Sequence, residues 1–127
     1  MRLNYLSDFL VRFKNKRNWD TPLRVLNSKF IVKLLETLKT TKLIDYRIES
    51  NTFKYLTIRV LRNSIRSIEL VSKPSRPVYK RCHELLNDAK LKKRGSFYIL
   101  SNSEWGLINS TEALERGVGG HIILLVS

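Results

Sequence analysis

The amino-acid sequence predicts an α+β fold made of two small modules. Apolar residues recur at helical spacing in about the first 40 residues, and an alternation of period two follows them. Pro74 and Pro77 then interrupt the pattern, which is typical of an extended connection. We therefore expect an N-terminal α/β module at residues 1–72, a basic linker at 73–80 and a C-terminal module at 81–127.

The first module is predicted to begin with two amphipathic helices and a short strand between them. A helix over residues 3–16 is indicated by an apolar stripe at positions i, i+3, i+4 and i+7, formed by Leu6, Phe9, Leu10 and Phe13. A second helix, ending near Lys39, carries the stripe Ile31, Leu34, Leu35 and Leu38. Residues 23–26 fit a strand, and the Ser28 side-chain oxygen can accept a hydrogen bond at the start of the second helix.

Strand-like alternation follows the second helix and predicts a three-stranded antiparallel meander. The three segments with alternating apolar and polar side chains are residues 44–49, 53–60 and 65–71. We expect them to pair in chain order, because neighbouring strands in the sequence usually neighbour one another in space. The two helices would then cover one face of this sheet.

The second module is predicted to be mostly β with one short helix. Its strands are expected in two apolar runs, residues 96–100 and 122–126. The segment 80–91 is ambiguous, and part of it is expected to be helical. A short helix is predicted at 111–116, where Asn109 or Ser110 can cap the start and Gly117 can end it in left-handed geometry.

Charge is the most informative compositional feature. The 127 residues include 24 Lys and Arg against 11 Asp and Glu, which makes the net charge +13 and the isoelectric point about 10.2. A compact chain with this charge repels itself, and binding to a polyanion relieves the repulsion. Nucleic acid is the commonest such partner, and an anionic membrane surface is the next commonest. No apolar run approaches the ~20 residues of a membrane span, so we expect nucleic acid and no membrane.

Catalysis and metal binding are not expected. Cys82 is the only cysteine and His83 is its neighbour, but two ligands are too few for a zinc site. No pair of carboxylates is placed for acid–base work, and there is no phosphate-binding glycine loop or nucleophilic serine motif. We therefore predict a protein with no enzyme activity, no cofactor and no small-molecule substrate.

Several segments of this chain resemble segments of a known protein family and follow one another in the same order, over nearly the whole chain. Leu6–Asn15 resembles the opening helix of the bacterial-type small-subunit ribosomal protein eight family, and Ser28-Lys29 is similar to its Ser-Ser-Lys. The segment Ser72-Lys73-Pro74-Ser75-Arg76-Pro77-Val78-Tyr79 resembles its Ser-Lys-Pro-Gly and Arg-Val-Tyr linker. Ser101-Asn102-Ser103 resembles its Ser-Thr-Ser loop, and Gly117-Val118-Gly119-Gly120 its glycine turn.

The resemblance implies a protein that binds the central domain of the small-subunit rRNA, supports subunit assembly and contacts neighbouring small-subunit proteins. Most RNA contacts would come from the second module. Hydroxyls and amides suit the shallow RNA minor groove, glycines permit close backbone approach, lysines and arginines meet phosphate, and tyrosine can stack. The expected RNA-binding residues are Ser28, Lys29, Lys33, Lys73, Arg76, Tyr79, Lys80, Ser101, Asn102, Ser103, Gly117, Gly119, Gly120 and His121.

The sequence departs from the family pattern at several positions. Asn102 replaces a threonine, His121 replaces an acidic residue, one extra residue lies near 104–105, and about three are inserted near 90–94. A closing aromatic residue is missing. With a composition rich in Asn, Lys and Ile, these departures favour an organellar ribosome, and a mitochondrion over a plastid, with the bacterial cytoplasm as a further alternative. We also expect Lys92 and Lys93 to touch rRNA or a neighbouring protein.

Simpler interpretations of these residues stay open. The serine loop can be an ordinary polar turn, the double glycine a turn before a strand, and Lys29 with Lys33 a solvated helix face. Tyr79 can belong to the core, and His121 can have a packing role. Two other functions also share the basic charge: a free-standing RNA-binding or ribosome-assembly factor, and an interaction protein whose charge only aids solubility.

Overall fold

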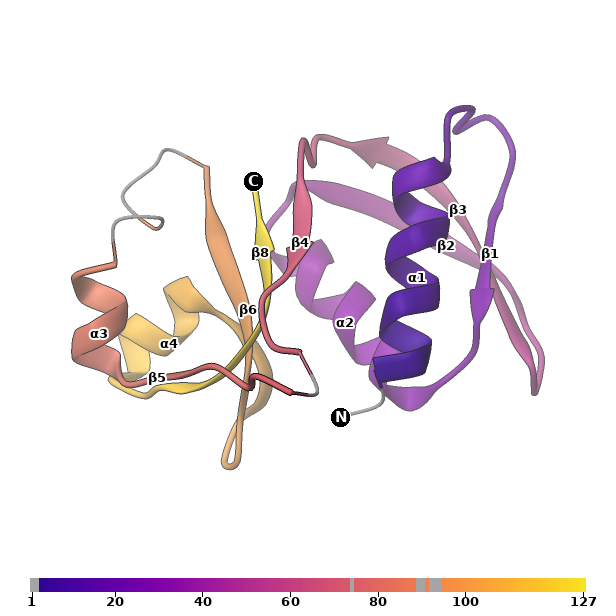
Figure 1. Cartoon of the computed structure of the whole chain (residues 1–127). Helices are drawn as coiled ribbons and strands as arrows, with labels where there is room; N and C mark the ends of the chain where they lie inside the picture. The colour runs from indigo at the N-terminus through magenta and orange to yellow at the C-terminus, as the bar shows by residue number, and fades with distance from the viewer. Residues whose placement is uncertain (1–2, 74, 89–90, 92–94) are drawn as a thin grey trace. The chain divides into compact units, whose positions relative to one another are not determined.

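The computed structural model describes residues 3–73, 75–88, 91 and 95–127. The chain forms two compact units, Met1–Ser64 and Ile65–Ser127 (Figure 1). Each unit has helices and an antiparallel sheet, so the predicted α+β fold of two modules is confirmed. The expected contacts of Lys92 and Lys93 lie outside the described residues.

The first unit packs two helices against a three-stranded sheet with the strand order β1-β3-β2. Both helices lie against this sheet and contact each other (Figure 1). In chain order, the elements of this unit are α1 (Leu3–Asn15), β1 (Leu23–Leu26), α2 (Lys29–Thr40), β2 (Ile44–Asn51) and β3 (Tyr55–Asn63).

The predicted helical stripes form the core of the first unit. Every residue predicted for the two stripes is buried, together with apolar side chains from all three strands. Ser28 caps α2 as expected: its φ of −156° is extended, and its hydroxyl accepts a hydrogen bond from the Ile31 amide at 3.1 Å. Helix α2 thus forms where local periodicity and a local cap agree.

The second unit has a five-stranded antiparallel sheet in which β8 is central. The strands follow the order β4-β8-β6-β7, and β5 also pairs with β8. Helix α4 packs against β6, β7 and α3, and these elements enclose a core that includes Leu85, Tyr98 and Ile122. In chain order the elements are β4 (Ile68–Leu70), β5 (Tyr79–Lys80), α3 (Cys82–Leu86), β6 (Phe97–Asn102), β7 (Gly106–Asn109), α4 (Ser110–Arg116) and β8 (Gly120–Val126).

The predicted meander is wrong in its third strand. The segment 65–71 contributes β4, which pairs with β8 of the second unit, with Ile68 opposite Val126. The third strand of the first sheet is instead β1, which pairs with β3. An alternating pattern indicates that one face of a strand is buried, but it does not indicate which strand pairs with it. The short β1 takes the place beside β3 that we had expected for residues 65–71. The second unit therefore begins at Ile65 rather than after the predicted boundary at residue 72.

Residues 73–80 also belong to the second unit and are not an extended linker between modules. The chain reverses here: the Arg76 amide donates to the Lys73 carbonyl at 2.9 Å, and the Lys73 amide donates to the Arg76 carbonyl at 3.2 Å. The buried Ser72 hydroxyl donates to the Ile122 carbonyl and accepts from the Val78 amide. Proline restricts local dihedral angles, but these long-range hydrogen bonds decide where the segment lies.

Candidate nucleic-acid interface

An exposed row of side chains crosses four strands of the second sheet. In the strand register Tyr79 lies opposite His121, His121 opposite Ser101, and Ser101 opposite Leu107. Directly opposed residues of antiparallel strands point to the same side of a sheet. Tyr79 and His121 are exposed, and Ser101 is partly exposed. Three residues predicted to bind RNA are thus neighbours on one face.

The two rings of this row are in direct contact. The Tyr79 and His121 centroids are 5.2 Å apart, and the rings meet edge to face. Tyr79 is 56% exposed, which excludes the interpretation of this ring as core. An edge-to-face contact restrains both rings while leaving aromatic faces open for stacking.

The β6–β7 hairpin presents the predicted polar loop, and Asn102 holds it in shape. The Asn102 amide nitrogen donates to the Gly119 carbonyl at 2.7 Å. Its side-chain oxygen accepts from the backbone amides of Glu104 at 2.8 Å and Trp105 at 3.1 Å. The carboxamide that we expected to contact RNA is therefore engaged within the chain, and its geometry makes it a support for the serines on either side.

The conformation and close packing of the protein's own backbone explain why glycine occupies positions 117, 119 and 120. Gly117 ends α4 with φ 69°, in the left-handed region that favours glycine. A Cβ on Gly119 would lie 2.2 Å from the Lys80 carbonyl oxygen, and one on Gly120 would lie 2.4 Å from the Ser101 carbonyl oxygen. Close approach of β5 and β6 to β8 thus accounts for Gly119 and Gly120, which we had expected at an RNA contact.

The three cationic residues at 73–80 that were predicted to bind RNA divide into two groups. Lys73 and Arg76 are exposed on the reversal that precedes β5. Lys80 instead extends its ammonium group to Asp88, at 2.6 Å, and the Asp88 side chain is almost fully buried. Lys80 is therefore a partner of a buried carboxylate, and its predicted contact with RNA stays a prediction.

The buried carboxylate belongs to a small polar cluster inside the second unit. The Tyr98 hydroxyl donates to Asp88 at 3.0 Å, and the Lys80 ammonium lies 5.9 Å from the Tyr98 ring centroid. Burial raises the pKa of Tyr98 to about 12, and the hydrogen bond and the negative charge of Asp88 add to the effect. A buried charge needs partners of this kind, so losing Lys80 or Tyr98 would remove a partner of Asp88 inside the unit that carries the row.

Sequence reasoning missed two residues beside the polar loop. The Arg116 guanidinium carbon lies 4.0 Å from the Trp105 ring centroid, and Arg116 also pairs with Glu112 at 3.2 Å. Trp105 is 47% exposed at the β6–β7 turn. An exposed tryptophan beside a turn glycine is a signal for a stacking surface, but the spacing of these residues does not predict that Arg116 reaches the ring.

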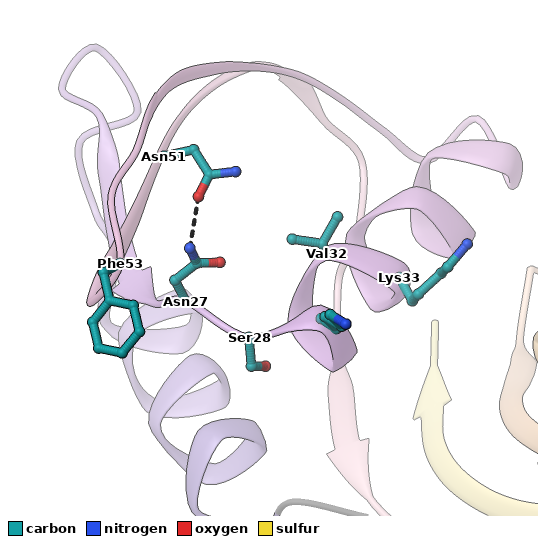
Figure 2. Close-up of a pocket in the computed structure, with 7 residues that line it drawn as sticks. Asn27, Ser28, Val32, Lys33, Asn51 and Phe53 are labelled. Carbon is teal, nitrogen blue, oxygen red and sulfur yellow. Dashed lines mark hydrogen bonds between the residues drawn. The ribbon is translucent and has the colours of Figure 1, made fainter.

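The remaining predicted residues, Ser28, Lys29 and Lys33, belong to the first unit. They line a groove at the start of α2 together with Phe53 (Figure 2). Lys29 and Lys33 are exposed. Lys33 has Glu36 at 3.7 Å, but an exposed pair of this kind contributes little and leaves the lysine accessible.

Among the residues that the structure describes, no group of three or more His, Cys, Asp or Glu side chains is arranged to hold a metal ion. None of the helices formed by the described residues is both long enough and apolar enough to cross a membrane.

The chain matches a protein-family model. The family model described as ribosomal protein S8 matches residues 4–126, which is nearly the whole chain. A search of curated proteins returned no match. The family match confirms the resemblance that the sequence motifs indicated.

Proposed function

Because this chain belongs to the ribosomal protein S8 family and is a protein of the small ribosomal subunit, we propose that it binds the central domain of the small-subunit rRNA and supports subunit assembly. The family is one of structural ribosomal proteins rather than enzymes. Neighbouring small-subunit proteins are its expected protein partners. The second unit is the main RNA-binding part in this proposal.

The observation that carries the proposal is the row Tyr79–His121–Ser101, in the same unit as the exposed cations Lys73 and Arg76. A-form RNA hides its base edges in a deep major groove, so proteins use the shallow minor groove, the 2′-hydroxyls, the backbone and unstacked bases. A hydroxyl can both donate and accept a hydrogen bond there. Exposed rings can stack on bases, and exposed cations meet phosphate. The row therefore offers each group that such a surface requires.

Each residue of the surface has a separate task in this proposal. The Ser101 and Ser103 hydroxyls contact the minor groove, while Asn102 keeps the hairpin in the required shape. Tyr79 and Trp105 stack on bases. Lys73 and Arg76 contact phosphate, and their charge adds to the general attraction of a chain with net charge +13.

We propose a mitochondrial ribosome as the location, with plastid and bacterial ribosomes as alternatives. The support is compositional: Ala89 and Ala113 are the only alanines, while Asn, Lys and Ile are plentiful. The test is sedimentation of small subunits from purified organelles and from the remaining cell extract. Recovery of the protein outside the mitochondrial fraction would contradict the assignment.

Binding to separate transcripts tests the rRNA target. We expect the protein to bind a central-domain transcript of its own small-subunit rRNA more tightly than transcripts of the other domains in a filter-binding titration. Replacing Ser101 and Ser103 with Ala should weaken this binding about tenfold, since each net hydrogen bond contributes ~0.5–1.5 kcal/mol. The control replaces Ser50 and Ser67, which are also exposed. Equal affinity of the two double variants would refute the role of the loop.

A high-salt wash separates a ribosomal constituent from a free-standing factor. We expect the protein to stay with small subunits through the wash, because many contacts with folded rRNA hold a constituent in place. An assembly factor or a general RNA binder depends mostly on salt-sensitive phosphate contacts and would leave. Loss of the protein from mature subunits would favour the assembly factor.

A further inference from the structure

A groove in the first unit lies between the start of α2 and the β2–β3 hairpin. Its volume is about 520 Å3, and Asn27, Ser28, Lys29, Val32, Lys33, Asn51 and Phe53 line it. Figure 2 shows Phe53 and Lys33 at opposite sides, with Val32 between them. A second hollow, of about 750 Å3, shares Phe53 and extends to Lys54. These volumes lie in the range of small-molecule sites, ~300–1,000 Å3.

The Phe53 ring is fully exposed on a rigid hairpin tip. Its relative exposure is 101%, so none of the residues that the structure describes covers either face of the ring. The tip is nevertheless held firmly: the Asn27 amide group donates to the Asn51 side-chain oxygen at 2.6 Å and to the Thr52 carbonyl at 2.7 Å. The Asn27 backbone amide also donates to the Lys54 carbonyl at 2.9 Å. A partner of this ring would meet a surface that is already ordered.

The polar groups around Phe53 favour an anionic partner. Lys29, Lys33 and Lys54 line the two hollows, and none of the described residues that line them is acidic. The Lys54 ammonium lies 5.4 Å from the Tyr55 ring centroid, and Lys29 is exposed. A flat ring with open faces, flanked by cations, matches a nucleotide better than an acidic peptide, because a base supplies a second flat ring and its phosphate supplies the charge.

We propose that this groove binds one unstacked nucleotide of RNA, with the base against Phe53 and the phosphate facing Lys29 and Lys33. The inference rests on the proposed rRNA function and adds a contact that is independent of the second unit. Phe53 is then a base-stacking residue.

The test uses the full chain and a transcript of the complete small-subunit rRNA. We expect Phe53→Ala to weaken binding by at least about fivefold, the lower end of the effect of losing one base–aromatic stack. The dependence of binding on salt should stay the same, because no charge is removed. Phe53→Trp should keep the affinity. The matched control is Leu61→Ala, which shortens another exposed apolar side chain of the same unit.

Tryptophan fluorescence gives a second measurement that does not depend on affinity. In a chain with Trp19→Phe and Trp105→Phe, Phe53→Trp places the only tryptophan in the groove, and we expect saturating rRNA to quench its emission. Unchanged emission at saturation, or equal affinity of Phe53→Ala and Leu61→Ala, would overturn the proposal. Loss of a neighbouring protein from reconstituted subunits with unchanged RNA affinity would overturn it in favour of a protein partner. If the parent chain itself prefers no rRNA transcript, the proposed function fails instead.

Discussion

The rings of Tyr79 and His121 meet edge to face across the pairing of β5 with β8, with 5.2 Å between their centroids. Ser101 lies on the other side of His121, on β6. The contact joins a residue of β5, which follows the chain reversal, to a residue of β8, which follows the glycine turn. Because both side chains are exposed, the pair forms part of a surface, and its stacking capacity can be tested without disturbing the core.

Replacing Tyr79 with Ala is expected to lower affinity for the central-domain transcript by at least about fivefold, since a base–aromatic stack is lost. Tyr79→Phe keeps the ring and should bind like the parent chain. The measurement is a filter-binding titration, with the folded state of each variant checked by circular dichroism. An equal loss in both variants would assign the effect to the hydroxyl group rather than to stacking.

Removing the exposed cations should change the salt dependence of RNA binding. Lys73→Ala and Arg76→Ala are each expected to reduce the slope of log affinity against log salt by ~1, because one phosphate contact is lost. Lys80→Met should leave the slope nearly unchanged and lower the free energy of unfolding by about 3 kcal/mol, since Asp88 loses the partner of a buried pair. A stable Lys80→Met protein with a reduced slope would show that this lysine contacts phosphate after all.

The glycines of the closing turn are expected to differ in their tolerance of alanine. At Gly119 and Gly120 a Cβ would meet the backbone of a neighbouring segment, so alanine should lower the free energy of unfolding by ~3 kcal/mol or more. At Gly117 no atom lies within 4 Å of the added Cβ, and only the left-handed φ is strained, at ~1–2 kcal/mol. Urea unfolding of the three variants measures this order, and equal losses would contradict it.

Stability at alkaline pH should depend on Tyr98. Its pKa is raised from 10.0 to about 12, so the folded state favours the neutral phenol over the phenolate. That contribution to stability is complete below pH 10.0 and is lost as the pH rises to about 12. We expect the urea midpoint of the parent chain to fall more over this interval than that of Tyr98→Phe. Parallel pH profiles for the two proteins would argue against this role of the phenol.

Local sequence patterns predicted where helices and strands form better than they predicted which strands pair with one another. The helical stripes and the Ser28 cap are properties of residues three or four apart, and both helices of the first unit are confirmed. Strands β5 and β7 were not identified as strands, because each has few residues and its polar or glycine content hides the alternation. The pairing of β4 with β8 joins distant parts of the chain, and no local pattern encodes such a partner.

In the candidate interface, too, the sequence predicted local motifs but not how their side chains are arranged in space. The polar loop and the exposed cations Lys73 and Arg76 were predicted as residues of an RNA surface, and that prediction still awaits its experiment. The hydrogen bonds of Asn102, the Lys80–Asp88 pair and the stacking of Arg116 on Trp105 were not predicted. Each depends on side chains that meet only after the sheet has formed.

The sequence by itself determined the α+β class, the two helices of the first unit, the excess of positive charge and the family, because periodicity, composition and motif order are all written along the chain. Only the tertiary structure decided that β4 belongs with β8, that Lys80 serves a buried carboxylate and that Tyr79, His121 and Ser101 form one row. The physical reason is that strand pairing and burial depend on which distant backbones satisfy one another's hydrogen bonds, and that choice is made by the whole chain together.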